Sequence, residues 1–376
     1  MKCSMHRFPM AAPDDLSGLR RLVEQGHVVA ADIVAVLGKT EGNGCVNDFS
    51  RGLAVHELGR YFRELLGEDA GSKVVLIMSG GTEGVLSPHA TVICRARQTR
   101  GDRGANANAG SSDKALTIGV ARTPPIRPED LGRASQARLV ADAVRAALRD
   151  GELALAADAH YVQVKCPLLT TESIAEAASR GATTVTDDTY KSMGFSRGAS
   201  ALGVAAALGE VDTDLLTDDA ICARWDRYSS VASASAGSEL KHCEVLVLGN
   251  SAAAEGDLVV GHDVMRDAID IGAVRRAAAA AGYETGGSSA ELVQVFAKAE
   301  ADPSGAVRCR RHTMLSDSDI NHTRHARAVV GGVVASFFGD PMIYVSGGAE
   351  HQGPSGGGPI AVVARRIAPG RRRFLA

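Results

Sequence analysis

One five-residue pattern occurs three times in this chain, as Ser79-Gly80-Gly81-Thr82-Glu83, Ser235-Ala236-Gly237-Ser238-Glu239 and Ser346-Gly347-Gly348-Ala349-Glu350. The first and third copies follow the apolar runs 74–78 and 342–345, which are typical of buried strands. Glycine directly after such a strand permits a tight turn and a close approach of other groups to the backbone. Three copies spread over the whole length predict an internal repeat.

The same order of parts surrounds each copy of the pattern. Each third is predicted to contain a strand, a helix, a strand that ends in lysine, a helix that begins at arginine, a strand that ends in serine, and a last strand. The polar, glycine-rich stretch 98–113 and the small-residue stretch 249–256 separate the thirds. We therefore expect an α/β protein with three homologous units, residues 1–104, 114–250 and 256–376, arranged with internal pseudo-threefold symmetry around one central active site.

Nine polar residues occupy equivalent places in the three units. An ungapped alignment of Arg197 with Arg327 supports this, because it also places Gly209 opposite Gly339. Solvated surface charge has no reason to recur in step with strand ends, so we expect the nine side chains to line one site. They are Lys39, Lys165 and Lys298 at strand ends, Arg51, Arg197 and Arg327 at helix starts, and Ser79, Ser235 and Ser346 at strand ends.

This set of residue types is suited to nucleophilic catalysis on an electron-rich ligand. A serine hydroxyl attacks only when a base takes its proton, and a lysine whose pKa is lowered by burial or by nearby cations can be that base. Backbone N–H groups beside each serine are suitable donors to a carbonyl oxygen or to a developing oxyanion.

The composition excludes several other functions. The chain has 376 residues, with 41 Lys and Arg against 44 Asp and Glu, so its charge of −3 indicates neither a nucleic-acid nor a membrane partner. Seven dispersed cysteines indicate free thiols, and no apolar run reaches the roughly 18 residues of a membrane span. A cytoplasmic protein is expected. Gly38-Lys39-Thr40 is similar to the end of a phosphate-binding loop, but Ile33 stands where that loop requires glycine.

A divalent cation is the one inorganic group that the sequence favours. The turn at residues 349–358 offers backbone carbonyls and Gln352, which are hard oxygen ligands for Ca²⁺ or Mg²⁺ if a carboxylate such as Glu300 reaches them. His322 and His325, near Asp317 and Asp319, are a weaker candidate, better explained as polar surface.

Four long stretches of the sequence, residues 38–48, 78–89, 162–170 and 346–354, resemble the cyanuric acid hydrolase/barbiturase family, and within it the cyanuric acid hydrolases. The resemblance covers essentially the whole chain. It implies a cyclic amide hydrolase, an amidohydrolase of the cyanuric acid type, with three Ser–Lys dyads around one site and no organic cofactor. It also implies a homotetramer. The expected reaction opens the s-triazine ring of cyanuric acid to carboxybiuret, which gives biuret and CO₂.

The same resemblance assigns roles to residues. It implies that Ser235 is the nucleophile and that Lys165 is its base. Substrate would be bound by Lys39, Lys298, Arg51, Arg197, Arg327, Ser79, Ser235, Ser346, Gly80, Ala236 and Gly347. A structural Mg²⁺ or Ca²⁺ would be held by Glu300, Ala349, Gln352, Gly353, Pro354 and Gly357.

Some alternatives stay open at the level of sequence. Ser233 competes with Ser235, and Arg324 competes with Arg327, although the repeat alignment favours Ser235 and Arg327. A barbiturase, which opens barbiturate to ureidomalonate, is the nearest rival enzyme. A protein that binds a small anion without catalysis is the rival from another class.

Overall fold

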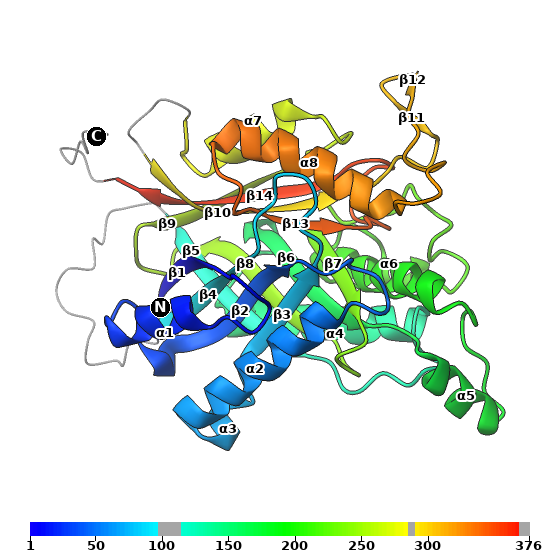
Figure 1. Cartoon of the computed structure of the whole chain (residues 1–376), viewed down its shortest axis with the longest axis horizontal. Helices are drawn as coiled ribbons and strands as arrows, with labels where there is room; N and C mark the ends of the chain where they lie inside the picture. Colours follow the sequence, from blue (N-terminus) through cyan, green and yellow to red (C-terminus); the bar gives the residue numbers. More distant parts are fainter. Residues whose placement is uncertain (97–113, 285–289, 368–376) are drawn as a thin grey trace.

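Three four-stranded sheets form the framework of this computed structural model, which describes residues 1–96, 114–284 and 290–367 (Figure 1). The predicted linker 98–113 lies outside the described residues. The first sheet has the order β1-β4-β2-β3. Its strands and the helices between them are β1 (Lys2–Pro9), α1 (Ser17–Glu24), β2 (Ile33–Thr40), α2 (Phe49–Leu66), α3 (Glu68–Gly71), β3 (Val75–Gly80) and β4 (His89–Ala96).

The second sheet repeats this order as β5-β8-β6-β7. Its elements are β5 (Ala115–Arg122), α4 (Ala134–Asp150), β6 (Ala159–Pro167), α5 (Thr171–Ser179), α6 (Thr189–Leu208), β7 (Ala232–Gly237) and β8 (Glu244–Ser251).

The third sheet has the equivalent order β9-β14-β10-β13. Its elements are β9 (Leu258–Met265), α7 (Ile271–Ala280), β10 (Ala290–Ala299), α8 (His322–Phe338), β13 (Tyr344–Gly347) and β14 (Gly358–Arg366), and a short hairpin, β11 (Ala306–Val307) with β12 (Arg310–Arg311), is inserted before α8. In every sheet the two strands that carry lysine and serine are parallel, whereas the other neighbours are antiparallel. The predicted order of parts is therefore found in each third.

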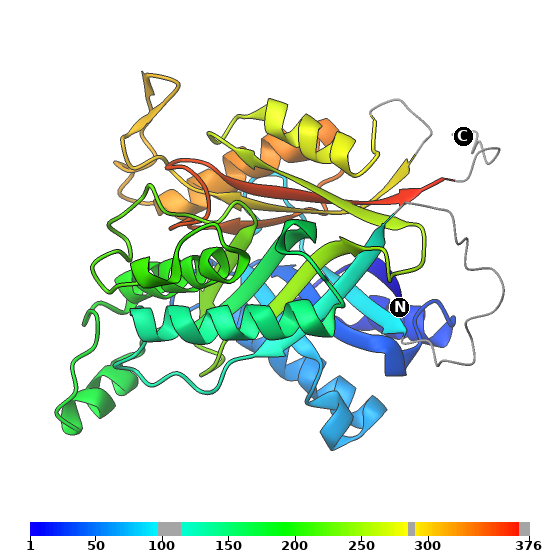
Figure 2. The same cartoon turned by 180° about the vertical axis from the view of Figure 1, so that it is seen from behind.

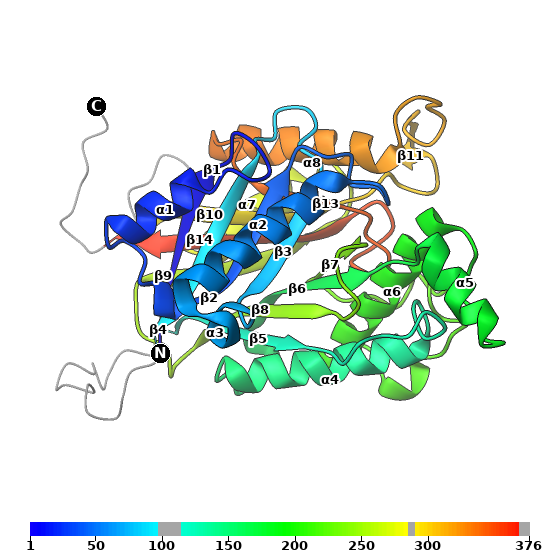
Figure 3. The same ribbon diagram turned by 60° about the horizontal axis from the view of Figure 1, so that its bottom comes forward.

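Helices cover one face of each sheet, and the opposite faces meet in the centre. Helix α7 packs on β9 and β14, and α8 packs on β10 and β13, above the third sheet in Figure 1. Helix α4 lies along β5 and β8 in Figure 2, while α2 crosses β2 and β3 in Figure 3. Each sheet-and-helix layer has its own apolar core, and a further core joins residues of all three sheets, among them Leu37, Ile77, Tyr161, Phe296 and Tyr344.

The helices that carry the three arginines begin at polar caps. Asp48, Asp188 and Asn321 each accept a hydrogen bond from the first turn, of α2, α6 and α8 respectively. Arg51 lies in the first turn of α2, but Arg197 lies in the middle of α6 and Arg327 in the second turn of α8. The prediction that all three arginines begin helices is therefore wrong for these two, because each helix starts upstream at its own cap.

Candidate active site

Each predicted lysine lies directly opposite the serine of its own unit. On the parallel strand pairs, Lys39 is the register partner of Ser79, Lys165 of Ser235, and Lys298 of Ser346. Ser233 is the partner of Gln163 and Arg324 is 40% exposed, whereas the side chain of Arg327 is 3% exposed. The structure thus places Ser235 and Arg327, not their competitors, in the repeated pattern.

The alternation of side chains along a strand directs this set to the centre of the molecule. Two residues before Lys39 and Ser79, on the same face of the sheet, Leu37 and Ile77 belong to the central core. The lysine side chains are at most 1% exposed, so their amino groups lie out of water between the sheets.

The hydrogen bonds of the lysine side chain differ between the second unit and the two outer units. Lys39 Nζ donates to Ser79 Oγ, and Lys298 Nζ donates to Ser346 Oγ, both at 3.1 Å. Lys165 Nζ instead donates to the carbonyl of Met78 at 2.8 Å and lies 2.7 Å from Oε1 of Glu239. Among the described residues, no hydrogen bond joins Lys165 to Ser235.

Burial and charge shift the pKa of each lysine downward. For Lys39, burial and the nearby Arg327 guanidinium hold the pKa well below its usual range, and burial with Arg197 does the same for Lys298. Burial also lowers the pKa of Lys165, but the carboxylate of Glu239 opposes this shift. A buried lysine of lowered pKa is the group that can take a proton from serine.

The arginines join neighbouring units around the site. Arg327 makes a bidentate ion pair with Glu83 at 2.6 and 2.7 Å, and Arg197 makes one with Glu350 at 2.6 and 2.8 Å. Arg51 donates to the carbonyls of Ala236 at 3.0 Å and of Cys45 at 2.7 Å. Each arginine is thereby held in a fixed position beside a serine-bearing strand end.

These groups surround one small cavity to which all three sheets contribute. The free space between the side chains is about 20 Å³, enough for a water molecule. The lining residues are Gly44, Arg51, Ser79, Gly80, Met193, Arg197, Ser235, Ala236, Arg327, Ser346 and Gly347.

The predicted site is therefore brought together, with two additions and one qualification. All three serines, all three arginines and the three residues that follow the serines line the cavity, while the lysines lie behind the serines. The prediction missed Gly44 and Met193. A signal for Met193 exists in the sequence, since it stands one helical turn before Arg197 and so shares its face of α6.

A buried polar layer distinguishes the second unit. Gln163 Nε2 lies 3.5 Å from Ser235 Oγ, and Gln163 Oε1 accepts from the hydroxyl of Tyr161 at 2.6 Å. The equivalent positions in the first and third units are Leu37 and Phe296, which are apolar. Ser233, the register partner of Gln163, is buried in the same layer.

The residues predicted to bind a cation lie together at the end of β10. Glu300 accepts a hydrogen bond from the backbone of Gly356 at 3.3 Å, and burial raises the pKa of its carboxyl to about 7. Gln352 is fully buried, and its side-chain oxygen accepts from the backbone N–H of Ala234 at 2.7 Å. A buried carboxylate beside a turn rich in carbonyls fits a hard cation. The described residues contain no group of three or more His, Cys, Asp or Glu side chains able to hold a metal.

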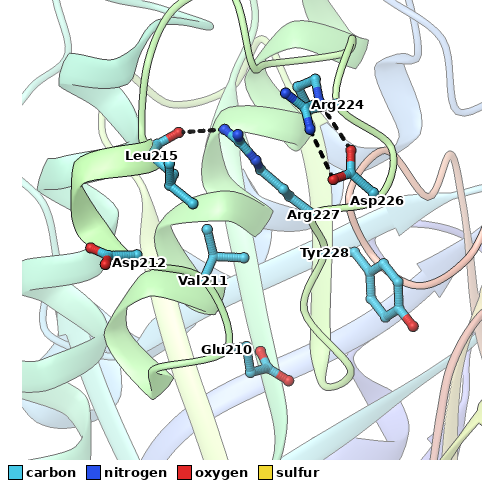
Figure 4. Close-up of a pocket in the computed structure, with 8 residues that line it drawn as sticks. All are labelled: Glu210, Val211, Asp212, Leu215, Arg224, Asp226, Arg227 and Tyr228. Carbon is cyan, nitrogen blue, oxygen red and sulfur yellow. Dashed lines mark hydrogen bonds and ion pairs between the residues drawn. The ribbon is translucent and has the colours of Figure 1, made fainter.

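A second, larger cavity lies on the surface, away from these residues (Figure 4). It measures about 530 Å³ and is lined by Glu210, Val211, Asp212, Leu215, Arg224, Asp226, Arg227 and Tyr228. Arg224 pairs with Asp226 at 3.1 Å, and Arg227 donates to the carbonyl of Leu215 at 3.0 Å. No residue of the repeated lysine–serine set lines it.

None of the helices in the described part of the chain is long and apolar enough to cross a membrane.

Comparison with known proteins finds relatives over nearly the whole length of this chain. Residues 4–365 match the family described as amidohydrolase ring-opening protein. The chain is 52% identical over 373 residues to a cyanuric acid amidohydrolase of Enterobacter cloacae, covering 97% of this chain and all of that protein. It is 53% identical to a second, from Pseudomonas sp. strain ADP, with 96% and 98% covered. The crystal structure of a cyanuric acid hydrolase from A. caulinodans superposes with a TM-score of 0.90 at 51% identity, covering 97% of this chain and 99% of that one.

Proposed function

Since this chain belongs to the family of ring-opening amidohydrolases, we propose that it opens the ring of cyanuric acid. The observation that carries this proposal is the recurrence of a lysine–serine register pair in all three sheets, around one cavity. Relatives that are named for this substrate and are about half identical over nearly the whole chain support the same assignment.

The arrangement of the site suits the symmetry of the substrate. Cyanuric acid is a planar ring with three carbonyl groups and three ring nitrogens in alternation. We assign the three units, 1–104, 114–250 and 256–376, to a pseudo-threefold arrangement in which each presents one serine, one lysine and one arginine to one edge of the ring. The three arginines favour a substrate that carries negative charge after loss of a ring proton.

Ser235 is the nucleophile in this proposal, and Lys165 is its base. The Oγ atom of Ser235 bonds to a ring carbonyl carbon while its proton passes to Lys165, and the oxyanion that forms is stabilised by backbone N–H donors at the strand end. The carbon–nitrogen bond of the ring then breaks, and the ring nitrogen takes the proton from Lys165. The polar layer at Gln163, found in the second unit alone of the three, supports the choice of Ser235.

A water molecule completes the reaction. Its hydroxyl group adds to the acyl carbon, the bond between that carbon and Ser235 Oγ breaks, and the remaining proton of the water returns to Oγ, so that one water is consumed and carboxybiuret is released. Loss of CO₂ from carboxybiuret gives biuret. The other two dyads, Lys39 with Ser79 and Lys298 with Ser346, hold the remaining edges of the ring together with the three arginines.

Two further assignments accompany the proposed reaction. Glu300, with the turn formed by Ala349, Gln352, Gly353, Pro354 and Gly357, would hold Mg²⁺ or Ca²⁺; the bound cation would neutralise the buried carboxylate and hold the turn. No organic cofactor is required by the reaction, and the active form is proposed to be a homotetramer.

Turnover decides between this function and its rivals. The protein is incubated separately with cyanuric acid and with barbituric acid, and the loss of ring absorbance is followed. We expect cyanuric acid to be consumed and biuret to accumulate. Loss of barbituric acid alone would make the protein a barbiturase, and binding without loss of either ring would make it a binding protein.

A further inference from the structure

The glutamates that end the three repeated patterns are equivalent in sequence but not in contacts. Glu83 of the first unit pairs with Arg327 of the third, and Glu350 of the third pairs with Arg197 of the second. In both pairs the glutamate meets the arginine of the preceding unit, if the three units are counted around a circle. On this pattern Glu239 of the second unit would pair with Arg51 of the first. Their closest approach is 4.0 Å, and the buried Nε of Arg51 has no hydrogen-bond partner among the described residues.

The backbone explains why the third pair lacks the close bidentate contact of the other two. Strands β3 and β13 end at the first residue after serine, and the next residues, Gly81 and Gly348, take φ values of 101° and 80°. A side chain at either glycine would collide with the arginine of the neighbouring unit, at 2.3 and 2.6 Å from its Nε atom. The glycines therefore allow these arginines to approach the strand end closely.

Strand β7 is longer at this end than β3 and β13, because it continues to the second residue after its serine. Ala236 replaces the first glycine, and Gly237 remains inside the strand. The side chain of Glu239 folds back over Gly237, where a Cβ atom would lie 2.1 Å from its Oε2. This orientation brings Oε1 of Glu239 to 2.7 Å from Nζ of Lys165. No ion pair of Lys39 or Lys298 is found within the described part of the chain.

We propose that Glu239 is a positioning residue for the reaction, which holds the amino group of Lys165 and stabilises the ammonium that forms when Lys165 takes the proton of Ser235. The inference rests on the proposed function. It makes the second unit a set of three residues, Ser235, Lys165 and Glu239, whereas each outer unit has a serine and a lysine alone.

In the proposed reaction, the carboxylate of Glu239 acts during the proton transfer from Ser235 to Lys165. As the Oγ atom of Ser235 bonds to the carbonyl carbon, its proton moves to Nζ of Lys165 and creates a positive charge in a buried place. Glu239 carries the matching negative charge and has an exposed side-chain fraction of only 10%. When the ring carbon–nitrogen bond breaks, the same proton passes to the ring nitrogen, and Lys165 is neutral again.

The contact also makes Lys165 a stronger base than its two equivalents. Burial lowers the pKa of all three lysines, and the charge of one glutamate opposes this shift in each unit, Glu83, Glu239 or Glu350. The pKa falls well below the usual range for Lys39 and Lys298 but less far for Lys165, whose carboxylate lies at 2.7 Å. Lys39 and Lys298, whose pKa values lie well below the usual range, are weaker proton acceptors than Lys165.

The test replaces Glu239 by its neutral near-isostere and uses the two equivalent glutamates as matched controls. In Glu239→Gln, kcat for cyanuric acid should fall by about 100-fold, the scale of general acid–base catalysis. The rising limb of kcat/KM against pH should move to lower pH, because loss of the carboxylate lowers the pKa of Lys165. Glu83→Gln and Glu350→Gln should leave this limb in place and act mainly on KM. Glu239→Asp should recover part of kcat.

Each other outcome overturns the inference. Wild-type kcat and an unmoved pH limb in Glu239→Gln would show that the carboxylate does not act through Lys165, while the proposed function would stand. An equal shift of the rising limb of kcat/KM against pH in the two control variants would show that loss of any nearby negative charge has this effect, and not the contact with Lys165. Thermal unfolding of all the variants separates loss of fold from loss of chemistry. Absence of turnover by the wild type would overturn both the function and the inference.

Discussion

Lys165 and Ser235 are direct partners on the parallel strands β6 and β7, yet the amino group of Lys165 contacts Glu239, at 2.7 Å, and the carbonyl of Met78. In the two outer units the equivalent lysine donates to its serine at 3.1 Å. The backbone thus repeats three times, whereas the side-chain contacts differ in the second unit. The shared backbone suits the binding of a symmetric ring, and the different contacts suit chemistry at one of its edges.

The polar layer behind Ser235 predicts an effect on kcat. Gln163→Leu introduces the residue type found at the equivalent position in the first unit, Leu37, and removes a donor to Ser235 and the acceptor of the Tyr161 hydroxyl. We expect kcat to fall about tenfold with little change in KM, the size of one lost hydrogen bond. Steady-state kinetics provide the measurement.

Gln294→Leu is the matched control for this change. Gln294 is equally buried, but its amide donates to Thr91 at 2.7 Å and not to a serine of the repeated set. This variant should lose stability and keep its kcat. An unchanged kcat in Gln163→Leu would contradict a role of Gln163 behind Ser235.

The inter-unit ion pairs predict a difference between two neighbouring arginines. Arg327→Gln leaves the carboxylate of Glu83 without its bidentate partner in a nearly buried place, and we expect the free energy of unfolding to fall by about 3–5 kcal/mol, with a higher KM. Arg324→Gln removes a half-exposed contact at 3.3 Å and should cost less than about 1 kcal/mol. Denaturant titration compares the two, and equal losses would be contrary to the assignment of Arg327.

A buried histidine predicts how stability depends on pH. Burial lowers the pKa of His89 to about 4, from 6.5 in the unfolded chain. Its Nδ1 lies 2.8 Å from the carbonyl of Ser87, and its Nε2 lies 3.2 Å from the amide of Gln294, which suits a neutral ring. Because the unfolded chain binds the proton more tightly, His89 has no effect well above pH 6.5 and destabilises the fold as the pH falls toward 4.

The accumulated loss from His89 is about 3 kcal/mol at pH 4, from the difference in pKa. In His89→Gln, the unfolding free energy should therefore fall less steeply between pH 6.5 and 4 than in the wild type. His27→Gln changes an exposed ring and should retain the wild-type slope. The same slope in all three proteins would refute the assignment of a buried neutral His89.

The proposed cation site predicts stabilisation by a metal. At about 100 times its Kd, Ca²⁺ or Mg²⁺ should add about 2.7 kcal/mol to the unfolding free energy of the metal-stripped protein. Glu300→Gln should abolish this gain, whereas Glu291→Gln, on the exposed face of β10, should keep it. Thermal unfolding after chelation and re-addition measures both, and an equal gain in Glu300→Gln would place the cation elsewhere.

Much of the fold and of the site could be predicted from the sequence, because short-range rules determine those parts. Apolar runs that end in Gly-Lys or Ser-Gly mark strands, and the alternation of side chains places Lys39 on the same face as Leu37. The repeat then makes one such strand pair imply two others. Gly209 and Gly339, which the repeat alignment places opposite each other, are both the C-terminal caps of their helices, α6 and α8.

The contacts that distinguish the units could not be predicted in this way. Glu83 and Arg327 are 244 residues apart, and no local pattern states which arginine a glutamate will meet. The start of α6 depends on the cap at Asp188, so Arg197 lies inside its helix and not at its beginning. The sequence shows that Ala236 stands where the other two copies have glycine. The resulting position of the Glu239 side chain is known only once the course of β7 is known.

The site of covalent attachment tests the central claim most directly. Wild-type protein is mixed with cyanuric acid, quenched in acid within one turnover, digested, and examined by mass spectrometry. We expect a transient adduct of one ring-opened substrate on the peptide that contains Ser235. It should be absent from Ser235→Ala, which should also lose at least about 10⁴-fold in kcat. An adduct on Ser79 or Ser346, or full turnover by Ser235→Ala, would contradict the central claim.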